Sequence, residues 1–165
     1  MTTVTTMTTT TAAAFAVAAA VTDPEMPMLT LADLGVLRRV ERTEDGTVAV
    51  TITPTYSGCP AMATMRDDLV HRLNDAGFAE VRVRVELSPA WSSDWITPRG
   101  REALTTHGVS APGGSHGSST TLTLLPTRRV LTCPRCGSSD TERTSEFGPT
   151  ACTALYRCTS CLEPF

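Results

Sequence analysis

The chain has 165 residues, of which 41% are hydrophobic, and a formal net charge of −3 at pH 7; its isoelectric point is near 5.6. This length and composition are typical of one modest globular domain with a small additional module. The net negative charge argues against a nucleic-acid partner, because phosphate backbones attract proteins that carry a strong positive field.

The first twenty residues have a biased composition. Residues 1–10 are rich in Thr and are predicted to be disordered, whereas the Ala-rich stretch 11–21 favours a helix that ends at the following Asp-Pro pair. The apolar run is too short to cross a bilayer and no basic residue precedes Arg38, so neither a membrane span nor an export signal is predicted. We expect a cytoplasmic protein whose cysteines act as ligands or functional thiols rather than disulfides.

Three runs of residues predict strands. Residues 36–42 and 47–53 flank a Glu-Asp-Gly turn and predict a β-hairpin, in which Val and Ile alternate along one face of the second strand. Residues 81–87 alternate apolar with charged side chains, which predicts a third, half-buried strand.

Two further segments predict helices. Apolar residues spaced by three and four give residues 62–73 one apolar face, and Pro60 is suited to the first turn. Residues 94–107 predict another helix that begins near Thr97. We therefore expect an α+β domain over residues 11–109, in which helices pack on a small sheet of about three strands.

The last third of the chain differs in composition. Residues 110–127 begin with SAPGGSHGSSTT, which predicts a flexible linker. Residues 128–165 contain five of the six Cys but too few apolar residues to bury a core. Such a short module needs a metal ion to fold.

Two CxxC pairs predict the metal site of that module. Cys133 and Cys136 form the first pair, and Cys158 and Cys161 form the second after an interval of 21 residues, which is close to the spacing of a four-thiolate zinc ribbon. Gly137 permits the positive φ that often follows such a turn. Zinc is the favoured ion, and a single iron or an iron–sulfur cluster is the alternative. Because protein ligands fill all four positions, the metal is expected to be structural.

Two other thiols lie outside the CxxC pairs. Cys59 directly precedes Pro60 and is predicted to be the N-cap of the helix over residues 62–73. There the helix dipole is expected to lower the pKa of the thiol, although an inert buried Cys is the alternative. His71 lies too far along the same helix to act as its base, so no hydrolytic triad is predicted. Cys152 precedes Cys158 by six residues and is either a buried small residue or an alternate ligand or redox partner.

Asp23 and Glu25 flank Pro24 at the end of the first predicted helix. By themselves they indicate a solvated turn. If the fold brings them near Cys59, two carboxylates and a thiolate together can hold a transient iron ion.

Four motifs carry a resemblance to a known family. They are DPEMP at 23–27, DLGV at 33–36, PTYSGCPA at 54–61 and PAWSSDWIT at 89–97. The first three are similar to the small domain shared by SufT and the iron–sulfur targeting subunits of the cytosolic assembly machinery. When the fourth motif and the four-Cys ribbon are included, the chain resembles the PaaD family. Members of that family are accessory subunits of the phenylacetyl-CoA epoxidase system in aerobic phenylacetate breakdown.

The resemblance covers roughly residues 12–165 and implies a function in iron–sulfur chemistry. It implies that the chain assists cluster assembly or insertion in a partner, such as the iron–sulfur reductase of the epoxidase, and does not itself catalyse epoxidation. The family's reactive Cys maps onto Cys59, its acidic motif onto Asp23 and Glu25, and its ribbon ligands onto the four CxxC cysteines. The role of Cys152 stays open. The resemblance also implies that the C-terminal tail is shorter than is usual in the family.

Two other functions compete with this expectation. A non-catalytic structural subunit of the oxygenase complex would use the segment around Trp91 and Trp95 as a contact surface. The alternative is that both Trp pack over the sheet edge; core packing is favoured for one of them, and exposure of the other would mark a partner surface. A nucleic-acid-binding ribbon is disfavoured, because the five Arg of residues 128–165 are offset by four acidic residues, which leaves about +1.

Overall fold

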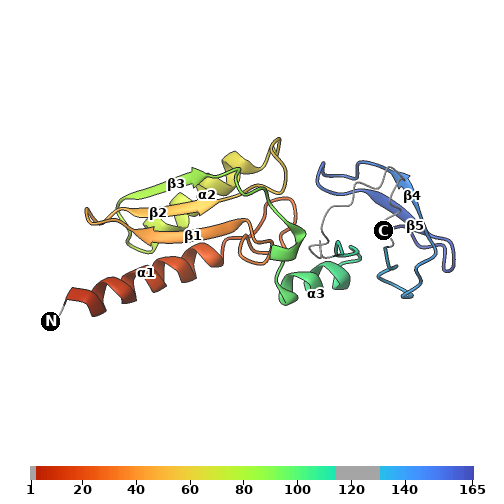
Figure 1. Cartoon of the computed structure of the whole chain (residues 1–165), viewed down its shortest axis with the longest axis horizontal. Coiled ribbons are helices and arrows are strands. Elements are labelled where there is room, and N and C mark those ends of the chain that lie inside the picture. The colour runs from red at the N-terminus through yellow and green to blue at the C-terminus, as the bar shows by residue number, and fades with distance from the viewer. Residues whose placement is uncertain (1–2, 114–130) are drawn as a thin grey trace.

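The computed structural model describes residues 3–113 and 131–165 (Figure 1), so residues 114–127 of the predicted linker lie outside the described residues. The first part contains α1 (Thr3–Ala19), β1 (Leu37–Arg42), β2 (Val48–Ile52), α2 (Met62–Asp75), β3 (Val81–Val85), the 3₁₀ helix η1 (Ser93–Trp95) and α3 (Pro98–Thr106). The second part contains β4 (Thr141–Ser145) and β5 (Leu155–Cys158). This order confirms the predicted α+β class.

The three-stranded sheet has the order β1-β2-β3. The predicted hairpin of β1 and β2 is antiparallel, and β3 returns parallel to β2 after the crossover through α2. The central strand β2 buries Val48, Val50 and Ile52 on one face, which explains their alternation in the sequence. On the edge strand β3, Val81 and Val83 are only half-buried and alternate with exposed Arg residues.

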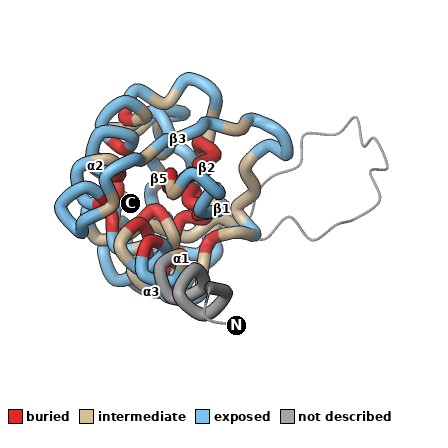
Figure 2. The backbone as a smooth tube through the Cα atoms, turned by 90° about the vertical axis from the view of Figure 1, so that its left-hand side faces the viewer, coloured by how far each residue is buried: buried red, intermediate tan, exposed pale blue. Residues whose placement is uncertain are grey.

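Two helices complete the core of this domain. Helices α1 and α2 contact each other and the sheet, and the buried segments lie on the inner sides of these elements (Figure 2). Helix α2 buries Met65, Leu69 and Leu73, as its periodicity predicts. Helix α1 buries Ala14 and Ala18, whose small side chains, one turn apart, let the helix approach the core closely.

Helix α1 begins earlier than the sequence predicts. It starts at Thr3 and so includes residues 3–10 of the segment that the sequence predicts to be disordered. Thr has a low helix propensity, but the Ala-rich segment that packs on the core supplies a formed helix. Extending a formed helix costs much less free energy than nucleating one.

Asp33, in the turn before β1, forms hydrogen bonds that hold the segment after β3 in place. Its carboxylate accepts bonds from the Thr30 N–H at 3.0 Å, from the Thr97 hydroxyl at 3.1 Å and from Arg99 Nε at 2.9 Å. Burial of Asp33 opposes ionisation, but the hydrogen bonds from Thr30 and Thr97 and the Arg99 charge outweigh it and lower the pKa of Asp33. Thr97 also caps α3 by accepting a bond from the Gly100 N–H at 3.0 Å.

Both Trp residues pack on their own domain. The indole N–H of Trp91 donates to the Leu34 carbonyl at 2.8 Å, and the Arg38 guanidinium lies 3.5 Å from the ring centroid of Trp95. Gly35 has a φ of +69°, and a Cβ there would lie 2.8 Å from the Trp95 carbonyl oxygen, so this contact requires glycine. Both Trp side chains are half-buried, which agrees with the interpretation that both pack on the domain.

The ribbon has almost no apolar core of its own. Strands β4 and β5 are antiparallel, and within residues 131–165 only Cys133, Thr141 and Cys158 are buried. The last residue pairs with β5: Phe165 and Tyr156 exchange two backbone hydrogen bonds of 2.7 and 2.9 Å, and their rings stack. Within the two described ranges, no helix has the length and apolar character to cross a membrane.

Candidate functional site

Asp23 builds a tight turn that presents Glu25. Its Oδ1 accepts bonds from the backbone N–H of Glu25 at 2.7 Å and of Met26 at 2.9 Å, and Pro24 fixes the backbone between them. The Asp23 N–H donates to the Leu29 carbonyl at 2.9 Å, which closes the loop. Asp23 is buried and Glu25 is half-buried. The two predicted acidic residues therefore differ, since Asp23 shapes the turn and Glu25 presents its carboxylate.

Cys59 lies in the turn between β2 and α2. Its N–H donates to the Tyr56 carbonyl at 3.3 Å, and its own carbonyl accepts from the Met62 N–H at 3.4 Å. The N-cap of α2 is Ala61, so the prediction of Cys59 as N-cap is wrong by two residues. These two consecutive turns precede the helix, whose first bond joins the Met65 N–H to the Ala61 carbonyl.

The pKa of Cys59 shifts in the direction opposite to the prediction. Burial is the largest cause and raises the pKa of the thiol, and the charges of Glu25, Asp23 and Cys152 raise it further. Only the Ala61 N–H, which donates to the sulfur, lowers it. The prediction took account of the helix start alone. The three neighbouring acidic groups favour the neutral thiol, and a bound cation would reverse that preference.

The four CxxC sulfurs form a single cluster. All four Sγ atoms lie within 4.8 Å of one another, with 3.7 Å between those of Cys133 and Cys161 and 3.6 Å between those of Cys136 and Cys158. Four thiolates about 2.3 Å from a tetrahedral ion lie about 3.8 Å apart. The observed spacing therefore fits a tetrahedral metal ion, and the predicted clustering is confirmed.

Each CxxC pair lies in a tight turn closed by backbone N–H groups. In the first, the Gly137 N–H donates to the Cys133 carbonyl at 2.9 Å, and Gly137 has the predicted positive φ, +77°. In the second, the Cys161 N–H donates to the sulfur of Cys158 at 3.5 Å, and Leu162 adopts a φ of +66°. This conformation costs a residue with a Cβ about 1–2 kcal/mol.

The ribbon thiols differ in acidity. The Cys161 N–H is the main cause that lowers the pKa of Cys158 to about 6. The Ser138 N–H favours the thiolate of Cys136, but hydrogen bonds among the sulfurs and burial together raise the pKa of Cys136 to about 12. A positive ion among the sulfurs would allow all four to ionise. The donor set thus fits a metal ion in chemistry as well as in geometry.

The two parts of the chain match two family models. Residues 11–86 match the model described as an iron–sulfur cluster assembly protein, and residues 117–165 match the model described as the PaaD zinc beta ribbon domain. A protein of Escherichia coli (strain K12), named as one of the subunits of 1,2-phenylacetyl-CoA epoxidase, is 46% identical over 150 residues, which cover 91% of this chain and 87% of that protein. This chain belongs to the PaaD family.

Two further relatives each match part of this PaaD-family chain. An "Fe-S protein maturation auxiliary factor" of Porphyromonas gingivalis is 32% identical over 76 residues, 46% of this chain and 71% of that protein. The crystal structure of a domain of unknown function, DUF59, from Bacillus anthracis superposes with a TM-score of 0.56 at 26% identity and covers 61% of this chain and 95% of that one. Each of these two matches therefore leaves more than a third of this chain uncovered.

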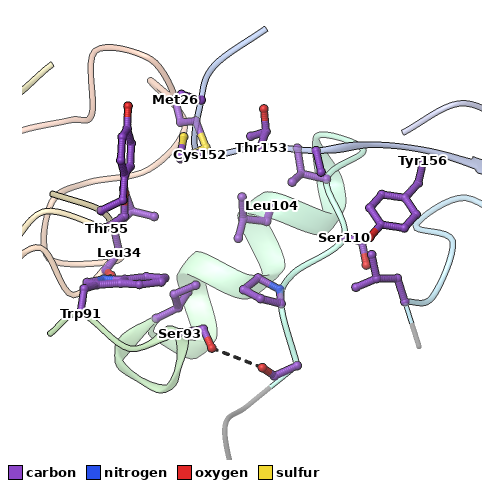
Figure 3. Close-up of a pocket in the computed structure, with 18 of the residues that line it drawn as sticks. Met26, Leu34, Thr55, Trp91, Ser93, Leu104, Ser110, Cys152, Thr153 and Tyr156 are labelled. Carbon is purple, nitrogen blue, oxygen red and sulfur yellow. Dashed lines mark hydrogen bonds between the residues drawn. The ribbon is translucent and has the colours of Figure 1, made fainter. Parts of the chain in front are cut away.

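In this PaaD-family chain, the ribbon reaches the acidic turn of the first domain. The Cys152 thiol donates to Glu25 Oε2 at an S···O distance of 3.9 Å, across 127 positions of sequence. Cys152 and Met26 face a cleft of about 1010 Å³ that is lined by both parts of the chain (Figure 3). Cys152 is exposed, so the interpretation of Cys152 as a buried small residue is wrong.

Sequence reasoning did not single out Tyr56. Burial raises the pKa of the Tyr56 hydroxyl, and the charges of Cys59, Glu25 and Cys152 raise it further. The charges of Glu25 and Cys152 therefore raise the pKa of both Tyr56 and Cys59. Its place three residues before Cys59 in the PTYSGCPA motif was the available signal.

Proposed function

We propose that this chain is an accessory maturation protein of a phenylacetyl-CoA epoxidase system, and that it assists assembly or insertion of an iron–sulfur cluster in a partner subunit such as the reductase. The observation that carries the proposal is the half-buried Cys59 thiol within the electrostatic field of Glu25, on a domain that matches the iron–sulfur assembly model. The names of two relatives support it, one a subunit of the epoxidase and one a maturation factor. In this proposal the chain catalyses no epoxidation.

The residues around Cys59 have separate roles in this proposal. Cys59 binds iron or a cluster iron, which is the cargo, through its thiolate. The Ala61 N–H, which donates to the sulfur, stabilises that thiolate. Asp23 holds the turn through its two backbone hydrogen bonds, and Glu25 adds negative charge that attracts the cation. The half-exposed position leaves the cargo accessible to a client.

The ribbon holds a structural zinc ion in this proposal. Tetrahedral sulfur spacing and the zinc ribbon family match support that assignment. The ion would stabilise the fold of the module and has no open coordination position for catalysis. Metal analysis of the purified chain tests the assignment, with one zinc per chain expected and stoichiometric iron as the contrary result. The ligands are Cys133, Cys136, Cys158 and Cys161.

Cluster loading of the reductase tests the main proposal. The reductase is co-expressed with this chain, and its iron and acid-labile sulfide are measured after anaerobic purification. Cys59→Ser is expected to reduce loading to the level found without the chain. Ser57→Ala is the matched control, because Ser57 is exposed in the same loop. Full loading in the presence of Cys59→Ser would overturn the proposal.

A structural subunit of the epoxidase complex is the second candidate function. It is supported by the name of the Escherichia coli relative, which is the name of a subunit. It is also supported by two exposed apolar side chains, Leu87 at the end of the sheet and Phe147 in the ribbon. The stoichiometry of the purified complex separates the two functions. A structural subunit co-purifies in a fixed ratio, whereas a maturation protein is substoichiometric.

A further inference from the structure

Cys152 reaches the first domain from the loop between β4 and β5. The Thr150 hydroxyl lies 3.2 Å from its sulfur, and the sulfur lies 3.9 Å from Glu25 Oε2. Its side chain is exposed and is not among the four clustered ribbon sulfurs. Formation of the ribbon metal site therefore leaves this thiol available for a second ligand.

The distance between Cys152 and Glu25 is close to that of two ligands of one ion. In a tetrahedral site with metal–sulfur bonds of about 2.3 Å and metal–oxygen bonds of about 2.1 Å, sulfur and oxygen lie about 3.6 Å apart. The observed 3.9 Å is a few tenths of an ångström longer. A small side-chain movement is sufficient for both groups to bind the same ion.

Cys59 lies within electrostatic range of the same pair. Its pKa responds to the charges of Glu25 and Cys152, and so does the pKa of Tyr56. Among groups of three or more such ligands in the described residues, only the ribbon cysteines have all their ligand atoms within 4.8 Å of one another. A bound ion would therefore have to draw Cys59 closer to the other two side chains. Both Cys59 and Glu25 lie on turns outside the helices and strands, where side-chain rearrangement is least restricted.

We propose that Cys59, Glu25 and Cys152 form a second metal site, at which the ribbon supplies one thiolate to an ion held by the first domain. This inference rests on the proposed function and adds a ligand to it. Two thiolates and one carboxylate suit a borderline divalent ion such as Fe²⁺. A fourth position stays open, so the ion can pass to a client.

The site explains why the ribbon and the assembly domain occur in one chain. The first domain alone offers one thiol, Cys59, whereas a transferable iron requires more than one strong ligand. The ribbon fixes the second thiol at the end of a loop whose strands are held by the metal cluster. Loss of the ribbon fold would then remove a ligand from a site in the other domain.

Cobalt titration of the full chain tests the second site. The protein is first loaded with one equivalent of zinc, and Co²⁺ is then added anaerobically while thiolate-to-cobalt absorption and zinc release are recorded. We expect one further equivalent to bind without release of zinc. Loss of an outer-shell partner weakens metal binding by roughly 10–100-fold. Because the three side chains are direct ligands in this proposal, Cys152→Ser, Cys59→Ser and Glu25→Gln should each weaken cobalt binding by more than this. Glu146→Gln, at an exposed ribbon carboxylate, should change it less than twofold.

The outcomes separate this inference from the proposed function. If Cys152→Ser binds cobalt as the wild type does while Cys59→Ser does not, the ribbon thiol is not a ligand and the inference is overturned, whereas the function of Cys59 stands. If the amount of cobalt bound equals the amount of zinc released, cobalt has only replaced zinc in the ribbon and there is no second site. Retention of one zinc by Cys152→Ser controls for an intact ribbon. The proposed function fails separately, if Cys59→Ser still loads the reductase.

Discussion

The first domain and the ribbon are stabilised in different ways. The first domain buries a continuous cluster of apolar side chains from α1, α2, α3 and the sheet, and the free energy comes mainly from removing that surface from water. Within the described ribbon residues, the only buried side chains are two cysteines and one threonine. Its two CxxC turns are joined by sulfur atoms 3.6–3.7 Å apart.

Because of this difference, the cysteines of the two parts have different roles. In the ribbon, the four CxxC thiols stabilise the fold by binding a metal ion, because residues 131–165 bury almost no apolar side chains. In the first domain the core is complete without a thiol at its centre, and Cys59 lies half-buried at its edge. A cysteine that the fold does not need is available for chemistry. Cys152 is the exception within the ribbon, since it lies outside the metal cluster.

Removal of the metal should have the largest effect, and it should act on the ribbon and not on the first domain. Structural zinc contributes about 10–16 kcal/mol of apparent binding free energy in small modules, so a chelator should unfold the ribbon and leave the first domain folded. Hydrogen exchange measures this by segment. Amides of β4 and β5 should lose protection, while those of the central strand β2 should keep it. Persistent protection of β5 in excess chelator would contradict a metal-dependent fold.

A core deletion should produce the converse effect. Leu69 is fully buried in α2, and Leu69→Ala should destabilise the first domain by about 2–5 kcal/mol. The metal affinity of the ribbon should stay within about twofold, because its ligands do not depend on this core. Urea unfolding and chelator competition measure the two effects. Leu155→Ala, at an exposed position on β5, is the control and should change neither by much.

Asp33 gives the first domain a dependence on pH that comes from a carboxylate and not from a metal site. Asp33→Asn should cost about 2 kcal/mol at pH 7, because hydrogen bonds to a buried charge are worth about 1.5–3 kcal/mol. The pKa of Asp33 in the fold is below its ordinary value of 3.8. The stabilisation is therefore present above pH 3.8 and is lost as the pH falls through the folded pKa.

Urea unfolding at several pH values measures that dependence. The stability difference between wild type and Asp33→Asn should shrink as the pH falls below 3.8. Asp75→Asn is the control, since Asp75 is exposed at the end of α2. A difference that stayed constant down to pH 2 would show that the Asp33 charge is unimportant.

The smallest expected effect distinguishes the two CxxC turns. Leu162 has a positive φ where the first turn has Gly137. Leu162→Gly should relieve about 1–2 kcal/mol of backbone strain and lose about 0.4–1 kcal/mol through a more flexible unfolded chain. Metal should then bind about two- to fivefold more tightly in a chelator competition. Gly137→Ala should weaken binding, and tighter binding by Gly137→Ala would refute the strain argument.

Local patterns in the sequence determined most of the fold and the ribbon site. The spacing of Met65, Leu69 and Leu73 identified α2, the alternation of Val and Ile identified β2, and the two CxxC pairs identified the metal cluster. These features depend on residues a few positions apart, or on a ligand geometry that closely restricts spacing. The start of α1 was missed, because cooperative extension from a docked helix overrode the low propensity of Thr.

Tertiary structure alone decided the surroundings of Cys59. The direction of its pKa shift depends on burial and on charges that converge through space, and the helix start seen in the sequence was the weaker influence. The contact between Cys152 and Glu25 joins positions 127 apart. No periodicity or spacing encodes such a contact, since it arises from the way the ribbon packs beside the first domain.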